Sequence, residues 1–313
     1  MSKRRAVKTP SVDDIFFSDD RWIRLMSNRI YYRQFMEHIL KSAKFELPLC
    51  YQGNFFYVDP ELDFSPLIDE ETHDIIGGKR GLKAKPPQTL YRTLEEYFAA
   101  HPTPKNCCSI YFVGDVHETG ADDPGDFGVH WNCVLFINFD DTRKDVYWFD
   151  PASGEAMRGG YNFASWKKHA ITNTLLRGVP IQQSSAGDIL PLYPPQHICN
   201  PSYACVDSFC QTWVMMFAAA FVENKVGQFT RLPFKKYSSY ILKTWLLCMM
   251  KQMPEWATEL KTKELKSFTF CRMPPVKEMI TLEDVSVVKV EPLEVQKGET
   301  CLDAIFRMFP PSV

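Results

Sequence analysis

An uninterrupted apolar stretch, residues 213–222, constrains the fold of this chain more than any other feature. It contains no charged residue, no glycine and no proline, and Glu223 and Asn224 follow it. A helix that is apolar on all sides is stable only when a protein core surrounds it. The stretch spans about ten residues, whereas a transmembrane helix needs about 20. The sequence therefore predicts a buried helix around which the core is built.

A cysteine lies where this predicted helix begins. Asp207 or Ser208 can cap the helix, because either side-chain oxygen can accept a hydrogen bond from an amide of the first turn. Cys210 would then lie at the positive end of the helix dipole, which stabilises a thiolate and can hold an oxyanion. A buried cysteine usually acts only as a small apolar residue. Catalysis is therefore predicted only if a second stretch of the sequence supports it.

The composition is that of a folded protein without a strong charge. Of the 313 residues, 45% are hydrophobic and 24% charged, and the net charge of −2 gives no basic field for nucleic acid. Residues 1–5 are basic, but no apolar segment follows them, so we expect no signal peptide. The ten cysteines are expected to be free thiols in a reducing compartment. Their spacing matches no common zinc motif, and no apolar run is long enough for a membrane span.

A β-hairpin is predicted upstream of the buried helix. Residues 129–139 and 146–149 are rich in β-branched and aromatic side chains, and a polar turn at 140–144 separates them. Pro151, which has no amide hydrogen, ends the second strand. A further strand at 109–113 precedes the hairpin, and a glycine-containing loop at 114–128 joins the two.

Shorter patterns predict the remaining elements. Apolar spacing indicates helices, and short β-branched runs indicate strands. The predicted helices cover residues 22–40, 93–100, 161–177 and 237–253, with a helical turn at 303–308, and the predicted strands cover 179–183 and 285–290.

The hairpin brings two catalytic residue types to the same place. His130 opens one strand and Asp150 closes the other, and adjacent antiparallel strands put these two ends side by side. The carboxylate would orient the imidazole, and the other ring nitrogen would face the thiol of Cys210. A strand-end histidine and a turn-capping aspartate each have ordinary structural explanations. Together, and followed by the cysteine helix, they predict a Cys-His-Asp triad.

The order of these motifs resembles a known protease family. His130-Trp131, then Tyr147-Trp148-Phe149-Asp150-Pro151, then a cysteine that opens an apolar helix is similar to the adenovirus protease and the related SUMO-type (ubiquitin-like protein) cysteine proteases. The block Phe209-Cys210-Gln211-Thr212-Trp213 resembles the form found in large DNA viruses. The resemblance covers roughly residues 105–225.

This resemblance implies an α+β fold with a papain-like, adenain-type core. A small mixed twisted sheet would pack on the nucleophile helix, with helical extensions at both ends. The implied division is an N-terminal extension at 1–104, a protease core at 105–255 and a C-terminal extension at 256–313. The family also implies a narrow tunnel that admits Gly-Gly substrates, and Trp131 would line it.

Two departures from the family pattern leave alternatives open. Most members have glycine directly after the nucleophile, where this chain has Gln211, and a glutamine six or seven residues before it, where this chain has Ala204 and Tyr203. Gln196, Gln211 or backbone amides could hold the oxyanion instead. Cys205 is an alternative nucleophile, although the long helix fits better from Cys210 onward.

The function implied by the resemblance is that of a cysteine endopeptidase, or thiol protease, which needs neither a cofactor nor a metal. Its substrate would be a viral structural polyprotein with Gly-Gly-X sites, cut during virion maturation, in the virion and the host cytoplasm. Alternatives are a protease that acts on a ubiquitin-like modifier, an acyltransferase of related fold, and an inactive virion scaffold or binding module. An activating peptide or nucleic acid is not evident in the sequence.

Overall fold

The computed structural model describes residues 29–40, 49–50, 55–58, 96, 98–99, 102–118, 127–155, 165–196, 210–253 and 296–312. Cys205, the capping candidates Asp207 and Ser208, and the strand predicted at 285–290 lie outside these residues. The first part of the helix predicted at 22–40 also lies outside them, and its second part is α3, Arg29–Leu40.

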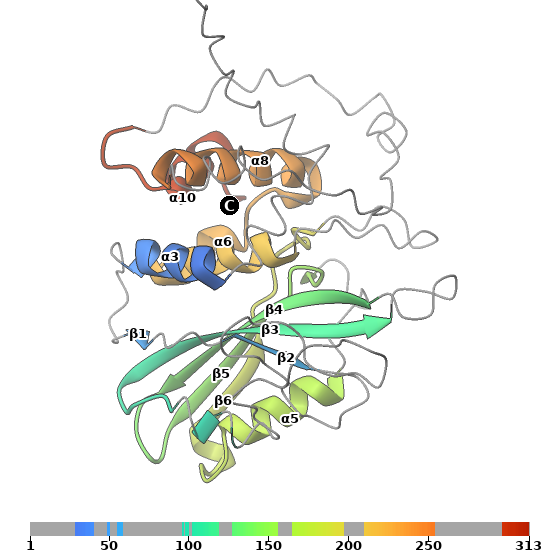
Figure 1. Cartoon of the computed structure of the whole chain (residues 1–313), viewed down its shortest axis with the longest axis vertical. Coiled ribbons are helices and arrows are strands. Elements are labelled where there is room, and N and C mark those ends of the chain that lie inside the picture. The colour runs from blue at the N-terminus through green and yellow to red at the C-terminus, as the bar shows by residue number, and fades with distance from the viewer. Residues whose placement is uncertain are drawn as a thin grey trace, which may run out of the picture.

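A six-stranded mixed sheet forms the centre of the described fold (Figure 1). Its order is β1-β3-β4-β5-β6, and β2 also pairs with β3. The inner strands β3, β4 and β5 are antiparallel neighbours, whereas β1, β2 and β6 pair parallel to their partners. The strands are β1 Leu49–Cys50, β2 Phe55–Val58, β3 Cys107–Glu118, β4 Phe127–Asn138, β5 Lys144–Phe149 and β6 Ser184–Asp188.

The predicted hairpin is confirmed as β4 and β5. Its turn is held by Asp140, whose Oδ1 accepts hydrogen bonds from the backbone amides of Thr142 and Arg143 at 2.7 and 2.8 Å. The strands before the turn are longer than the sequence predicts. Residues 114–118 and 127–128, expected in a loop, extend β3 and β4, because each residue there has a partner on the facing strand.

The prediction of a strand at residues 179–183 is wrong. A 3-10 helix, η2, occupies Ile181–Gln183, and the strand β6 follows it at Ser184–Asp188. The Ser-Ser-Ala-Gly-Asp sequence of β6 has none of the branched and aromatic residues by which strands are recognised. Parallel pairing with β5 at the edge of the sheet determines its conformation instead.

The buried helix is confirmed as α6, Cys210–Val222, and all of its side chains are buried. Phe217 of α6 stacks on Phe149 of β5, with ring centroids 4.1 Å apart, and Trp213 meets Phe234 edge-on at 5.6 Å. The stacking of Phe217 on Phe149 packs the helix, and with it Cys210, against the hairpin.

The helices form layers on both sides of the sheet (Figure 1). α3 and α6 cover one face, with α8 and α10 outside them, and α5 lies on the other face. Within the described residues, no helix is both long and apolar enough to cross a membrane. The remaining helices are α5 Ser165–Leu175, α7 Val226–Phe229, α8 Phe234–Gln252 and α10 Cys301–Met308.

The C-terminal helix is tied to the core by a disulfide and an ion-pair cluster. Cys248 of α8 and Cys301 of α10 form a disulfide across 53 positions of sequence, so the expectation that every cysteine is a free thiol is wrong. Sequence spacing does not reveal such a pair, because only the packing of α8 on α10 brings the two cysteines together. Lys225, after α6, bonds Glu223 at 2.6 Å and Asp303 of α10 at 2.7 Å. The three-part division of the chain stays a prediction.

Candidate active site

His130 and Asp150 are in direct contact. Nε2 of His130 lies 2.8 Å from Oδ1 of Asp150, and both side chains are shielded from solvent. His130 is part of β4, and Asp150 directly follows β5. The hairpin thus places the two groups side by side.

The turn after β5 fixes the Asp150 carboxylate. Oδ1 of Asp150 also accepts a hydrogen bond from the backbone amide of Ala152 at 2.8 Å. The backbone carbonyl of Asp150 accepts one from the amide of Ser153 at 3.1 Å. A carboxylate held by both a backbone amide and an imidazole has little freedom to rotate. Asp150 can therefore hold the His130 ring in one orientation.

A glycine allows a second segment to approach this turn. A Cβ on Gly154 would lie 2.6 Å from the backbone nitrogen of Pro194, so only glycine fits there without displacing the backbone. The backbone amide of Glu155 donates to the carbonyl of Pro191 at 2.8 Å, and that of Gln196 donates to the carbonyl of Pro151 at 2.9 Å. These contacts bring Gln196 to the corner that holds Asp150. The sequence reasoning did not single out Gly154, although the Asp-Pro-Ala-Ser-Gly run is typical of a tight turn.

Cys210 is the first residue of α6, and its side chain is 6% exposed. Its thiol acts on the His130 ring and helps to raise the pKa of that imidazole. Because Nε2 of the imidazole is engaged by Asp150, Nδ1 is the ring nitrogen left for the sulfur. The structure places His130 against Asp150, and the role of Cys210 as the third member of a triad stays a prediction.

The environment of His130 favours its protonated form. Burial alone lowers the pKa of His130, because the charged ring loses its hydration. The charge and hydrogen bond of Asp150 act in the opposite direction, as does the interaction with Cys210, and the net result raises the pKa of His130 to about 10. The ring therefore carries a proton at neutral pH, and an imidazolium stabilises a thiolate beside it.

Replacing Asp150 by asparagine is expected to lower the pKa of His130 by at least about two units, because burial then acts without the opposing carboxylate charge. In the native protein, the stability that His130 contributes is complete below its unfolded pKa and is lost as the pH rises through about 10. The Asp150→Asn protein should lack this alkaline loss. NMR titration of the ring and unfolding measurements across pH check both effects.

Asp145→Asn is the matched control, because Asp145 is a buried carboxylate near the other end of β5. It should leave the titration of His130 unchanged. A native-like His130 titration in Asp150→Asn would show that Asp150 does not set the charge of the ring.

A second buried cysteine on β4 provides a contrast. Cys133 is fully buried, and this burial, followed by the nearby Cys108, raises the pKa of Cys133 well above the usual thiol value. A thiol in such surroundings stays protonated and unreactive. Cys133 is therefore a structural residue and no competitor of Cys210.

Three other residues selected from the sequence are buried in the described structure, and a fourth lies outside it. Gln211 is the second residue of α6 and is 4% exposed, and Gln196 is 2% exposed beside the Asp150 corner. Trp131 is buried next to His130 on β4, where its register partner on β3 is Gly114. Cys205 lies outside the described residues, so its distance from His130 is not defined.

Lys168 of α5 is a neighbour that the sequence reasoning did not identify. It forms an ion pair with Asp188 of β6, and its Nζ lies 5.8 Å from the centre of the Trp148 ring. Burial lowers the pKa of Lys168, and the charge of Asp150 partly opposes this effect. No sequence signal marks this lysine, because only the packing of α5 on the sheet brings it near β5.

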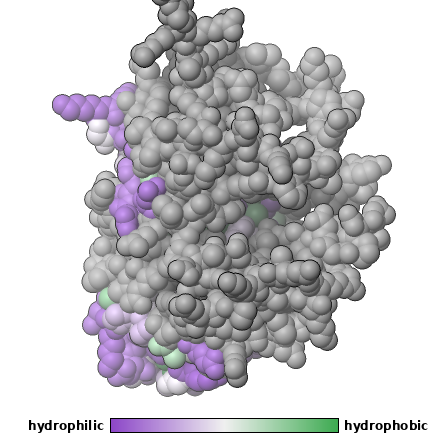
Figure 2. Space-filling model, in the orientation of Figure 1, coloured by the Kyte–Doolittle hydropathy of each residue, from purple (hydrophilic) through white to green (hydrophobic). Residues whose placement is uncertain are grey.

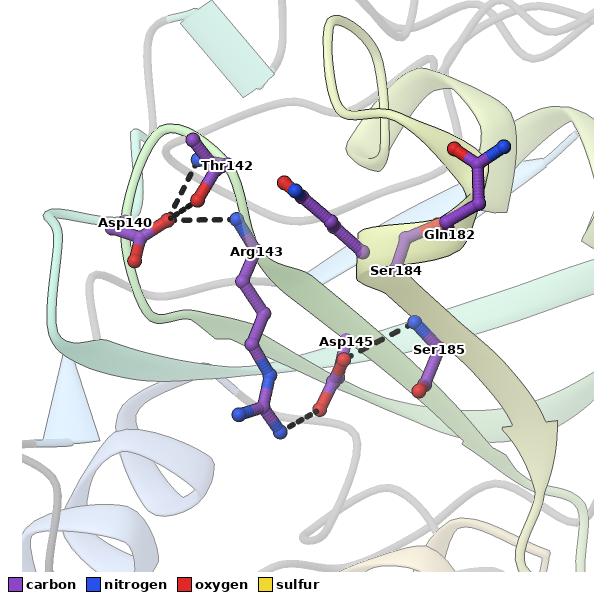
Figure 3. A pocket seen from close by; sticks show the side chains of 8 residues that line it. Asp140, Thr142, Arg143, Asp145, Gln182, Ser184 and Ser185 are labelled. Atoms are coloured by element: carbon purple, nitrogen blue, oxygen red, sulfur yellow. Dashed lines mark hydrogen bonds and ion pairs between the residues drawn. The ribbon is translucent and has the colours of Figure 1, made fainter.

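A polar pocket lies at the other end of the sheet, beside the hairpin turn (Figure 3). It has a volume of about 460 Å³, and Arg143, Asp145 and Ser185 are among its lining residues. Asp145 accepts a hydrogen bond from the amide of Ser185 at 3.1 Å and lies 3.6 Å from the Arg143 guanidinium. The described surface around this end is mostly hydrophilic (Figure 2). The pocket contains none of the three residues of the candidate centre.

No protein-family model and no curated protein matches this chain. Among solved structures, the ASFV pS273R protease is similar over 55% of this chain, with 11% identity and a TM-score of 0.22, and this chain spans 52% of it. The central domain of the uncharacterized Lpg1148 protein from Legionella pneumophila is similar over 71% of this chain and 96% of its own, with 14% identity and a TM-score of 0.27.

The Legionella pneumophila effector protein RavZ, in complex with human LC3B, is similar over 77% of this chain and 73% of its own, with 10% identity and a TM-score of 0.26. TM-scores this low do not establish a shared fold. The chemistry of the site itself therefore carries the functional assignment.

Proposed function

We propose that this chain is a cysteine endopeptidase with Cys210 as nucleophile. The observation that carries the proposal is the 2.8 Å contact of His130 with Asp150, and it is supported by the place of Cys210 at the start of α6 and by the effect of its thiol on the pKa of the same ring. The Cys210 thiolate attacks the carbonyl carbon of a peptide bond, and the carbonyl oxygen becomes an oxyanion. The start of α6 favours this negative charge, because the helix dipole is positive at that end.

His130 acts first as the general acid and then as the general base of the reaction. As an imidazolium, it donates a proton to the leaving amine when the tetrahedral intermediate collapses to a thioester. The neutral ring then takes a proton from water, which attacks the thioester and releases the acid product. Asp150 holds the ring during both steps and stays a carboxylate.

The oxyanion would be held by the backbone amide of Cys210 and by a side-chain amide. Gln196 and Gln211 are the two candidates for that side chain, because one lies beside the Asp150 corner and the other directly follows Cys210. Loss of one oxyanion donor typically lowers kcat by about 100- to 1,000-fold. The resemblance to the adenovirus and SUMO-type proteases implies a core of the papain-like, adenain type.

The proposed substrates are polypeptides with Gly-Gly-X sites, in the first place a viral structural polyprotein cut in the virion or the host cytoplasm. The resemblance of the His130-Trp131 and Asp150-Pro151 motifs to the adenovirus and SUMO-type proteases supports this choice. A ubiquitin-like modifier that ends in Gly-Gly offers the same chemistry. Trp131 is proposed to line the channel that admits glycine and excludes larger side chains.

Incubation of the purified protein with a Gly-Gly-X peptide and its Gly-Ala-X counterpart tests this proposal. We expect cleavage after the second glycine, and about a 10- to 200-fold lower rate for the alanine peptide, because a narrow channel has no room for the added methyl group. Mass spectrometry of the new termini gives the site. Equal cleavage of both peptides would contradict the Gly-Gly specificity, and cleavage of neither peptide nor of a candidate polyprotein would contradict the protease assignment.

A further inference from the structure

Asn132 of β4 is a buried polar residue with an unexplained position. Its side chain is fully buried, and within the described part of the chain neither Oδ1 nor Nδ2 of Asn132 has a hydrogen-bond partner. Buried polar groups nearly always make hydrogen bonds, because an unpaired one destabilises the native state. The loss of stability caused by the unpaired Asn132 carboxamide suggests that this side chain has a role other than stabilising the fold.

The register of the sheet puts Asn132 beside the candidate catalytic centre. The last pair of β4 and β5 towards that centre is Cys133 with Phe149, and Asn132 and Asp150 are the next residues of the two chain segments beyond this pair. Side chains opposite each other on antiparallel strands share a face, with Cβ atoms about 4.5–5.5 Å apart. His130, two residues from Asn132 on β4, points to that face as well.

We propose that Asn132 is a positioning residue whose Nδ2 donates a hydrogen bond to the Asp150 carboxylate during the stage in which His130 is neutral. This inference rests on the proposed function. In the resting site, the imidazolium lies 2.8 Å from Asp150 and compensates its charge. After His130 has protonated the leaving amine, Asp150 is a buried anion beside an uncharged ring.

The carboxamide matches that need. It carries two N–H donors, and a carboxylate has about four acceptor positions, so the amide can turn to Asp150 without displacing the imidazole. No proton or electron is transferred to Asn132 in this step. The amide only keeps the carboxylate, and through it the ring, in place until water has attacked the thioester.

Other charged groups around Asp150 come from different elements. Lys168 on α5 acts on Asp150 by its charge but forms its ion pair with Asp188. Cys210 on α6 interacts with His130. When the His130 ring loses its proton, Asp150 loses the positive charge of its hydrogen-bonded partner.

The test is Asn132→Leu, which keeps the branched shape and the number of heavy atoms of the side chain and removes both polar atoms. We expect the melting temperature to stay the same or rise, because an unpaired buried amide is gone. We expect kcat for the Gly-Gly-X peptide to fall by about 10-fold at unchanged KM. The pKa of His130, followed by NMR, should rise by up to about one unit, because the neutral-ring state has lost its donor to Asp150.

Asn138→Leu is the matched control on the same strand. Asn138 donates from Nδ2 to the carbonyl of Thr103 at 2.7 Å, far from the centre, so this variant should lose stability and keep the native His130 titration. Native kcat and His130 titration in Asn132→Leu would overturn the inference, as would a joint loss of stability and activity with an unchanged titration.

The His130 titration also separates this inference from the proposed function. It needs no substrate, so it can be measured even if no peptide is cleaved. A wild-type protein that cleaves no peptide would contradict the proposed function, whereas a shifted titration in Asn132→Leu would still support the contact between Asn132 and Asp150.

Discussion

Replacing Cys210 by alanine is expected to lower the cleavage rate of a Gly-Gly-X peptide by at least about 10,000-fold, to the background rate. The reason is that the only attacking atom of the proposed mechanism is lost, while the fold is kept. Alanine is smaller than cysteine by one sulfur atom and has the highest helix propensity, so α6 should form as before. Peptide cleavage followed by chromatography, together with circular dichroism, measures both properties.

Two cysteines serve as controls for this experiment. Cys205→Ala changes the alternative nucleophile, and Cys133→Ala removes a fully buried thiol on β4. Both variants should keep most of the native activity at temperatures at which they remain folded. Loss of activity in Cys205→Ala, with native activity in Cys210→Ala, would move the nucleophile to Cys205.

Replacing His130 by glutamine is expected to lower kcat by about 10,000-fold as well. The loss of one residue of a catalytic unit lowers the rate about as much as the loss of the whole unit. Glutamine cannot carry the proton to the leaving amine, but its amide can donate a hydrogen bond to Asp150 in place of Nε2. His130→Ala should be equally inactive and less stable by about 3 kcal/mol, because it removes the ion-pair partner of the shielded Asp150 carboxylate. Steady-state kinetics and denaturant unfolding separate the two variants.

His169→Ala is the control for the histidine variants. His169 is an exposed residue of α5, and its loss should change neither activity nor stability by a measurable amount. Turnover by His130→Gln at the native rate would exclude His130 as the proton carrier.

The parts of the fold that follow from local sequence pattern could be predicted. The charge-free stretch of residues 213–222 has no stable place outside a core, and α6 is fully buried as expected. Two segments rich in branched and aromatic residues indicated the hairpin, and its pairing brings His130 and Asp150 together. The three candidate catalytic residues could be selected because each lies where a predicted element begins or ends.

The parts that depend on tertiary packing could not be predicted. β6 consists of small and polar residues, and only the open edge of β5 makes it a strand. The disulfide between Cys248 and Cys301 needs α10 to return to α8 across 53 positions. Gly154 is required by the approach of Pro194, and the place of Lys168 by the packing of α5. None of these contacts leaves a local pattern in the sequence.

Asn132 could not be recognised from the sequence for a related reason. An asparagine within a strand of apolar residues could equally face solvent, hydrogen-bond a neighbouring loop or lie unpaired in the core. Only its burial without a hydrogen-bond partner among the described residues, together with its place one step beyond the Cys133–Phe149 pair, indicates a role in the site.

The most direct test of the central claim is covalent labelling with a Gly-Gly peptide whose C-terminus carries a vinyl methyl ester, to which a thiolate adds irreversibly, followed by peptide mapping. The claim is that Cys210, activated by His130 and Asp150, is the nucleophile. We predict a single adduct, on Cys210, that does not form in His130→Gln. An adduct on Cys205 instead, or no adduct in the wild-type protein, would contradict it.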